Sequence, residues 1–287
     1  MGRIAYVNGR FVPHGEAMVH IEDRGYQLAD AVYEVWSLFD GRMADAEGHF
    51  ARLERSLSEL RMPMPMSRRA LTLVLREAVR RNRISEGVVY LQVSRGVAVR
   101  DHAFPAAEVR PSVVITVKAV DRAAAEAKAA QGVGVVTTPE NRWGRCDIKT
   151  TGLLPNVLAR QKAKEAGAAE AWFVDELGFV TEGAAANAWI VDGDGRLRTR
   201  DTNANILRGV TRRTLMEVIA EEGLQVDERP FTPAEAVAAK EAFNTGAGAL
   251  VMPVVSVDGK PIGNGAPGVL AMRLRRLYIE RARAGAL

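Results

Sequence analysis

The sequence contains one cysteine, four histidines and no long apolar run, and each scarcity excludes a class of protein. Cys146 cannot form an internal disulfide, and a lone thiol is typical of a reducing compartment, so we expect a cytoplasmic protein with Cys146 as a small packed side chain. No stretch approaches the roughly 18 consecutive apolar residues of a membrane span, so we expect no membrane partner. Three histidines lack metal-ligand spacing with one another or with Cys146, which predicts no metal site: His14, His20 and His49.

Charge of one sign is not concentrated at any point in the chain either. The 39 basic and 35 acidic residues give a formal net charge of +4, but they are scattered, with no lysine or arginine block and no basic runs paired with aromatics. Nucleic-acid binding is therefore not expected. The 287 residues, 47% of them hydrophobic, are enough for two ordinary domains with a real core.

Periodicity predicts a small N-terminal α+β domain over residues 1–120. Asn8-Gly9 is a strong signal for a two-residue hairpin turn, and residues 32–38 form a strand-like run. Apolar residues then recur at helical spacing, and β-branched runs follow them. The helices are expected at 47–61 and 67–82, and the later strands at 88–94 and 112–120.

An alanine-rich stretch at 121–132 separates this half from a large C-terminal α/β domain over residues 133–287. The stretch itself is expected to be an interdomain linker or a short helix. Glycines that follow helical patterns mark helix ends in the second half, and Asp-to-Gly turns join its strands. The expected elements are a strand at 133–137, helices at about 153–166, 211–222 and 267–284, and hairpin turns at 175–178 and 192–195.

Two segments have the residue types that bind anions. Gly209 and Thr211 stand immediately before a helix, where free backbone N–H groups and the helix dipole favour a phosphate, although a plain helix cap explains the same residues. In the loop that follows the strand at 88–94, Arg100 and His102 could form a fork that captures a carboxylate. Incidental charges in a solvated loop would give the same pattern.

Two further residues are candidates for chemistry. Lys149 stands just before a helix, next to Ile148 and a pair of threonines, so it could be partly buried, which favours the neutral, nucleophilic amine. The alternative is an exposed surface lysine. Glu182 ends a strand beside a glycine, where a turn acid and a buried cofactor contact look alike.

Seven short motifs favour the functional interpretation of these residues, because the motifs occur together and in order. They are EDRGYQ at 22–27, DAVYE at 30–34, HFARL at 49–53, RGVAVRDH at 95–102, RWGRCDIK at 142–149, TEG at 181–183 and LRGVTR at 207–212. With these motifs the sequence resembles the D-amino acid aminotransferases over essentially its whole length. That group belongs to the fold type IV pyridoxal-phosphate enzymes, together with branched-chain aminotransferases and aminodeoxychorismate lyase.

The resemblance implies pyridoxal 5'-phosphate as the cofactor and assigns roles around it. Lys149 matches the lysine that carries the cofactor and then moves a proton at the substrate Cα. Glu182 matches the acid that pairs with the ring nitrogen and keeps it protonated. Arg52 matches the phosphate-binding arginine, and it lies off the apolar stripe of its helix, free to point away from that helix's core.

More cofactor contacts are implied in the second half of the chain. Leu207 would pack on the ring face, while Val210 and Thr211 would complete a phosphate cup through their backbone amides and the threonine hydroxyl. Relatives have serines and threonines where this chain has Gly246-Ala247, so the hydroxyl contact expected at Ala247 is absent. Backbone amides of the glycine-rich turn could still hold the phosphate.

Substrate choice is implied by a third group. Tyr33, Arg100 and His102 match the carboxylate trap of the D-amino acid enzymes, in which the arginine and histidine come from the partner subunit, and a homodimer follows. Branched-chain relatives lack the Arg-x-His pair. Alanines at 184–186 stand where relatives often have serines, which removes possible hydrogen bonds beside the substrate but leaves the reaction class intact.

The function expected from the sequence is transamination between a D-amino acid and a 2-oxo acid. Two alternatives use the same machinery with a different pocket, namely an (R)-selective amine transaminase and a branched-chain-type aminotransferase. A lyase of the aminodeoxychorismate kind comes third. A catalytically silent cofactor-binding protein is the alternative from another class.

Overall fold

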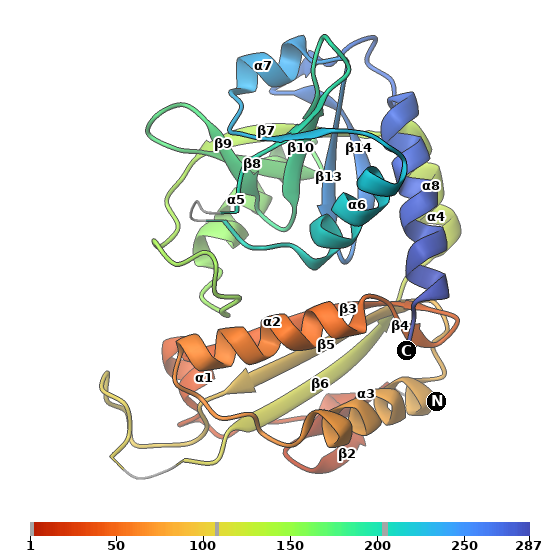
Figure 1. Ribbon diagram of the computed structural model, residues 1–287. Helices are drawn as coiled ribbons and strands as arrows, with labels where there is room; N and C mark the ends of the chain where they lie inside the picture. The colour runs from red at the N-terminus through yellow and green to blue at the C-terminus, as the bar shows by residue number, and fades with distance from the viewer. Residues whose placement is uncertain (1–2, 107–108, 203–205) are drawn as a thin grey trace. The chain divides into compact units, whose positions relative to one another are not determined.

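The chain folds as two units, each built on its own β-sheet (Figure 1). The computed structural model describes residues 3–106, 109–202 and 206–287. The first unit takes the chain up to residue 121 together with 148–152 and 285–287, and the second takes 122–147 and 153–284. Every helix in the described residues is too short or too polar to cross a membrane.

The first unit is a six-stranded antiparallel sheet with two long helices packed on one face. In chain order its elements are β1 (Ile4–Val7), β2 (Arg10–Pro13), η1 (His14–Glu16), α1 (Arg24–Leu28), β3 (Ala31–Phe39), β4 (Arg42–Met43), α2 (Ala46–Glu59), α3 (Arg68–Asn82), β5 (Gly87–Ser94) and β6 (Ser112–Ala119). The strand order is β2-β1-β6-β5-β3-β4. Helix α2 lies against β3, and α3 lies against β1 and β6.

Alternation along β3 decides which of its side chains the helices cover. Trp36 and Leu38 are fully buried and belong to the core that α2 and α3 complete. Tyr33 and Val35 are only half-buried. Because successive side chains of a strand point to opposite faces, Tyr33 lies on the face opposite the helices.

A short segment from later in the chain adds to the edge of this sheet. Thr150 forms a bridge with Val32, and the backbone N–H of Tyr33 donates to the carbonyl of Lys149 at 3.0 Å. Ile148 is buried in the core of the first unit. The division expected from the sequence assigns 148–152 to the C-terminal half, whereas the structure has these residues in the first unit. The reason is strand pairing with a distant segment, for which the local sequence has no signal.

The second unit is a mixed nine-stranded sheet with helices around it. Its elements are α4 (Arg122–Gln131), β7 (Val133–Pro139), α5 (Leu154–Glu165), β8 (Glu170–Val174), β9 (Val180–Gly183), β10 (Asn187–Val191), β11 (Leu197–Thr199), α6 (Val210–Glu221), β12 (Val226–Glu228), α7 (Pro233–Ala238), β13 (Glu241–Gly246), β14 (Leu250–Val257), β15 (Lys260–Pro261) and α8 (Val269–Ala284). The order is β12-β11-β10-β13-β14-β7-β8-β9, and β15 pairs with β14. Strand β7 runs parallel to both neighbours, and β11 runs parallel to β12.

The expected helices and strands are present in both units, with ends that differ by a residue or two. The α+β character of the first half and the mixed helix and sheet content of the second are therefore confirmed. The stretch at 121–132 is helix α4, the second of the two interpretations given to it. The structure adds β13 and β14, which form the middle of the second sheet and which the sequence patterns do not predict.

A buried arginine ties α8 to α4 within the second unit. The side chain of Arg275 is 2% exposed. Its guanidinium binds both carboxylate oxygens of Glu126 and donates to the carbonyls of Ala249 and Val251, at 3.0 and 2.6 Å. One buried side chain therefore joins α8 to α4 and to the backbone around the start of β14.

We predict that Arg275→Met lowers the free energy of unfolding by about 2 kcal/mol, because a buried, charged donor to two carbonyls and a carboxylate is lost. Urea denaturation measures the change. Arg273→Met is the matched control on the same helix, since Arg273 is half exposed and its ion pair with Glu222 lies at the surface. Equal losses in the two variants would contradict the role given to Arg275.

Candidate functional site

The first unit buries a carboxylate between two basic side chains. Glu34, on the helix-facing side of β3, is fully buried. Its Oε1 accepts from Arg52 Nε at 2.7 Å, and its Oε2 accepts from Arg52 Nη2 at 2.8 Å. His49 Nδ1 lies 2.7 Å from Oε2. His49 and Arg52 are three residues apart on α2, so they share the helix face that looks toward Glu34.

Burial alone would raise the pKa of Glu34, but the charge and hydrogen bonds of Arg52, together with His49, lower it to about 2. The same burial lowers the pKa of His49, although Glu34 opposes the effect. The pair Glu34–Arg52 is therefore ionised at neutral pH beside an uncharged imidazole. Arg52 lies off the apolar stripe of α2, as expected, but its side chain is 9% exposed and bound to Glu34 rather than free of the core.

Lys149 lies close to this group. Its backbone N–H donates to Ser56 Oγ on α2 at 3.4 Å, one helical turn after Arg52. Its carbonyl pairs with β3, and its side chain is half-buried, with Nζ 4.2 Å from the centre of the Tyr33 ring. The structure therefore brings Lys149 and Tyr33 together at the start of β3, and places the Lys149 backbone against α2, the helix that carries Arg52.

Tyr33 is part of a stacked aromatic pair. Its ring centroid lies 5.6 Å from that of Tyr90 on the neighbouring strand, with an angle of 29° between the planes. Burial, with the nearby Tyr33, raises the pKa of Tyr90 to about 12, and its hydroxyl donates to Gln92 Oε1 at 2.8 Å. The stack fixes Tyr33 beside the Lys149 amine.

Arg100 and His102 lie elsewhere in the first unit. Both are exposed, in the loop that leaves the end of β5 (Figure 1). Tyr33 is the member of the expected carboxylate trap that lies beside Lys149.

The second unit has its own buried carboxylate, Glu182, near the end of β9. Its side chain is 5% exposed. Oε1 accepts from Arg142 Nη1 at 2.5 Å and from the backbone N–H of Leu207 at 3.1 Å, and Oε2 accepts from Asn187 Nδ2 at 3.0 Å. These donors favour the ionised carboxylate.

Arg142 is held by a second acid rather than by Glu182 alone. Its guanidinium makes two bonds to Glu140, at 2.9 and 2.6 Å, and lies 4.4 Å from the centre of the Phe173 ring. Burial alone would lower the pKa of Arg142, but Glu140 and Glu182 raise it well above its usual range. Thr181 Oγ1 also donates to Glu140, at 2.7 Å. Arg142 is thus a fixed cation beside Glu182.

Asn187 connects Glu182 to the beginning of α6. Its Nδ2 also donates to the carbonyl of Leu207, at 3.0 Å. A Cβ at Gly209 would lie 2.0 Å from Asn187 Oδ1, so a side chain where the helix begins would require Asn187 to move. Gly209 is the N-cap of α6 and supplies no side-chain cap, and buried Val210 and Thr211 open the first turn. This end of the helix has backbone N–H groups suited to an anion.

The turn that contains Gly246 and Ala247 lies beside the same strands. Thr245 on β13 pairs with Asn187 on β10, and its Oγ1 accepts from Trp189 Nε1 at 3.0 Å. A Cβ at Gly246 would lie 2.9 Å from the carbonyl of Ala185, so the turn closely approaches the alanines at 184–186. The structure therefore brings together Glu182, Leu207, Val210, Thr211, Gly246 and Ala247.

Cys146 has the properties of a packed thiol. Burial raises its pKa to about 11, although Arg142 opposes the effect, and Sγ donates to the carbonyl of Trp143 at 3.1 Å. Within the described residues no three His, Cys, Asp or Glu side chains gather as metal ligands.

The donors present suit a phosphorylated, electron-accepting ring compound. The uncapped start of α6 suits a dianion, the ionised Glu182 suits a protonated ring nitrogen, and the half-buried Lys149 amine can attack a carbonyl carbon. Because Gly209 and Gly246 have no side chain, the backbone at these two positions of the second unit is left uncovered. These are the requirements of pyridoxal phosphate.

Comparison with known proteins agrees with this chemistry. The profile of the family described as amino-transferase class IV matches residues 31–257, and the chain belongs to this family. It is 36% identical over 279 residues to the D-alanine aminotransferase of Staphylococcus haemolyticus, covering 96% of this chain and 97% of that one. It is 38% identical over 268 residues to the D-alanine aminotransferase of Bacillus licheniformis, covering 93% of each.

Solved structures agree in fold. A branched-chain amino acid aminotransferase of T.th., solved with pyridoxamine 5'-phosphate, superposes with a TM-score of 0.90 at 26% identity, over 100% of this chain and 98% of that one. That of Escherichia coli has the same fold, with a TM-score of 0.90 at 24% identity, over 98% and 95% of the chains. The resemblance found in the motifs and the fold type IV architecture are confirmed.

Sequence reasoning did not find the partners of the expected residues. Glu34 and His49 lie within the motifs DAVYE and HFARL, but the motif resemblance assigns them no role. The signal for Glu34 in the sequence is a charged residue inside the apolar run of β3. Asn187 and Glu140 have no such signal. Glu140 binds Arg142 and Thr181, and Asn187 binds Glu182 and Leu207, contacts that only the structure reveals.

We predict a pH-dependent contribution of Glu34 to stability. Its pKa is lowered from 4.5 to about 2 on folding, so the contribution is full above about pH 4.5 and is lost as the pH falls toward 2. At neutral pH it is worth about 3 kcal/mol. Glu34→Gln should therefore be less stable than wild type at neutral pH, and urea denaturation at decreasing pH should show the difference shrinking below about pH 4.5.

Glu77→Gln is the control for this prediction. Glu77 also has a pKa lowered to about 2, through hydrogen bonds from Arg80 and Arg81, but it lies in an exposed pair on α3. Solvent screens that pair, so little change is expected at any pH. A stability difference for Glu34→Gln that stays constant with pH would refute the assignment.

Proposed function

We propose that this protein transfers an amino group between a D-amino acid and a 2-oxo acid, with pyridoxal 5'-phosphate as its cofactor. The observation that carries the proposal is the buried Glu182, held by Arg142, Asn187 and the Leu207 N–H beside the uncapped start of α6. The likeness to D-alanine aminotransferases over at least 93% of the chain supports the D-amino acid substrate and the 2-oxo acid acceptor. The protein is thus a pyridoxal-phosphate-dependent transaminase.

In the first unit we assign one role to each of two residues. Lys149 carries the cofactor and, once its amine is free, takes and returns the proton at the substrate Cα; its position on the edge of β3, against α2 and Tyr33, orients the amine. Arg52 binds the phosphate group, with its planar head oriented by Glu34.

In the second unit the residues hold the ring and the phosphate. Glu182 accepts from the ring nitrogen and keeps it protonated, which its ionised state permits. When bound, the cofactor supplies a ring that accepts the electron pair left when the Cα proton departs. Leu207 covers the ring face, and further phosphate contacts come from Val210, Thr211, Gly246 and Ala247.

The D configuration follows from where the α-carboxylate is held. We assign this to Tyr33 together with Arg100 and His102, the last two supplied by a second copy of the chain in a homodimer. Their exposure in the loop after β5 leaves both side chains accessible to another molecule. Holding the carboxylate on one side determines which Cα hydrogen faces Lys149. The cytoplasmic location expected from the lone thiol stays a prediction.

A second candidate is a branched-chain-type or (R)-selective amine transaminase. The superposition on branched-chain aminotransferases favours it, because the same fold serves both. Arg100 and His102 argue against the amine transaminase, since a charged fork has no use when the substrate lacks a carboxylate. They argue against the branched-chain type because, by the resemblance given above, branched-chain relatives lack the Arg-x-His pair. We therefore give the D-amino acid substrate precedence.

Two variants test the proposal. Arg100→Ala should reduce kcat/KM for D-alanine by about a hundredfold, because a charge-assisted bond to the substrate carboxylate is lost, and should reduce turnover of a simple (R)-amine far less. Lys149→Ala should abolish turnover of both substrates, since no other residue is assigned to the proton transfer. Steady-state assays with pyruvate or 2-oxoglutarate as acceptor measure both effects.

The outcomes separate the two parts of the proposal. Equal losses toward D-alanine and the amine in Arg100→Ala would overturn the carboxylate trap. Turnover at the parent rate in Lys149→Ala would overturn the transamination mechanism itself.

A further inference from the structure

The loop that carries Arg100 and His102 is exposed, yet it is attached to the first unit at three points. Its start is bound by backbone contacts, with Val97 bridging Asp23 and the N–H of Arg24 donating to the carbonyl of Gly96 at 2.9 Å. Gly96 has a φ of +107°, and a Cβ there would lie 2.2 Å from the carbonyl of Arg110. These backbone contacts therefore fix the direction in which the loop leaves β5.

The second attachment lies between the two exposed side chains. Arg24, 3% exposed at its side chain, donates from Nη1 to the carbonyl of Asp101 at 2.7 Å and from Nε to Asp30 Oδ2 at 2.8 Å. Asp101 is the residue between Arg100 and His102. One guanidinium thus ties the backbone between the two trap residues to a carboxylate at the start of β3.

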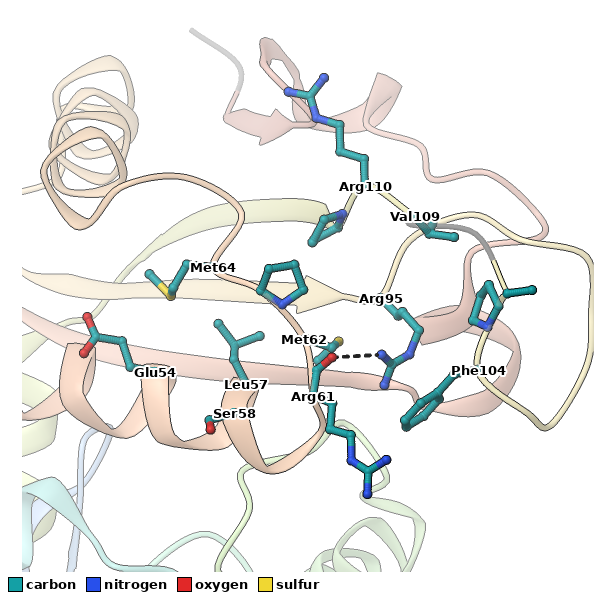
Figure 2. A pocket seen from close by; sticks show the side chains of 14 residues that line it. Glu54, Leu57, Ser58, Arg61, Met62, Met64, Arg95, Phe104, Val109 and Arg110 are labelled. Atoms are coloured by element: carbon teal, nitrogen blue, oxygen red, sulfur yellow. Dashed lines mark hydrogen bonds between the residues drawn. The ribbon is translucent and has the colours of Figure 1, made fainter.

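The third attachment uses the same carboxylate. Arg95 binds Asp30 through Nε and Nη2, at 2.6 and 3.0 Å, and Nη2 also donates to the carbonyl of Leu60 at 2.8 Å. Its guanidinium lies 3.7 Å from the centre of the Phe104 ring, an arrangement visible in Figure 2. Asp30, Arg24 and Arg95 therefore hold the loop on both sides of His102, and we call these three residues the loop anchor.

The loop anchor is charged and shielded from water. Burial alone would raise the pKa of Asp30, but hydrogen bonds from Arg95 and Arg24 lower it, so all three side chains carry charge. A bond from a charged donor to a backbone carbonyl is stronger than one between neutral groups. The bond to Asp101 is the one contact of the anchor that lies directly between the trap residues.

We propose that Arg24 is a positioning residue for recognition of the substrate carboxylate, because it fixes the backbone at Asp101 and so presents Arg100 and His102 in one arrangement. This inference rests on the proposed function. A loop that is already ordered loses less conformational entropy when it binds, so the benefit appears in substrate affinity. Arg24 touches neither the substrate nor the cofactor in this role.

Arg24→Met is the informative variant. Asp30 keeps both bonds to Arg95, so no charge is left unpaired, and the methionine fills much of the arginine stem's volume. We expect KM for D-alanine to rise about tenfold through loss of one charge-assisted bond, with kcat nearly unchanged. Turnover of a simple (R)-amine, which has no carboxylate to recognise, should fall far less. Arg80→Met, which removes an exposed arginine of α3, should alter neither reaction.

A double variant separates failure of this inference from failure of the proposed function. If Arg24 acts through the loop, Arg24→Met adds little to the loss already caused by Arg100→Ala. Equal losses for D-alanine and the amine in Arg24→Met, no rise in KM, or fully additive losses in the double variant would overturn the positioning role. Loss of the amine reaction in Arg100→Ala would instead overturn the carboxylate trap.

Discussion

A carboxylate removed from water must be held by positive charge or by several donors, and this constraint organises both units. Glu34 is held by Arg52, Asp30 by Arg24 and Arg95, and Glu182 by Arg142 with two neutral donors. Arg52, Arg95 and Arg142 each come from a separate segment of the chain from the acid they bind, whereas Arg24 lies six residues before Asp30. The buried charges therefore fix the positions of segments that hydrophobic packing alone would leave free to slide.

Each of these ion pairs lies one contact away from a residue with an assigned role. Glu34 orients the head of Arg52, and Arg142 keeps Glu182 ionised without taking its Oε2, which Asn187 binds. Substituting the acids would leave buried arginines unpaired, which costs more than the bond itself. The hydrophobic cores of the two units account for most of the stability. The ion pairs determine how the side chains assigned to proton transfer and binding are oriented.

The sequence was most informative where a role depends on local context. Helix and strand periodicity predicted most elements, and the ordered motifs predicted the reaction class and the roles proposed for Lys149 and Glu182. The contacts between distant segments could not be predicted. Asp30 contacts Arg95, and Lys149 contacts Tyr33, only because strands far apart in the sequence lie side by side. For the same reason the local sequence groups Lys149 with the C-terminal half, and the ion pair of Arg52 with Glu34 has no signal in the sequence around either residue.

Reaction of the holoenzyme with D-alanine in the absence of any 2-oxo acid tests the D-amino acid assignment most directly. We expect the absorbance band of the bound cofactor to bleach while one equivalent of pyruvate is released per active site, and L-leucine to leave the band unchanged. Bleaching by L-leucine but not by D-alanine would contradict the assignment of a D-amino acid substrate.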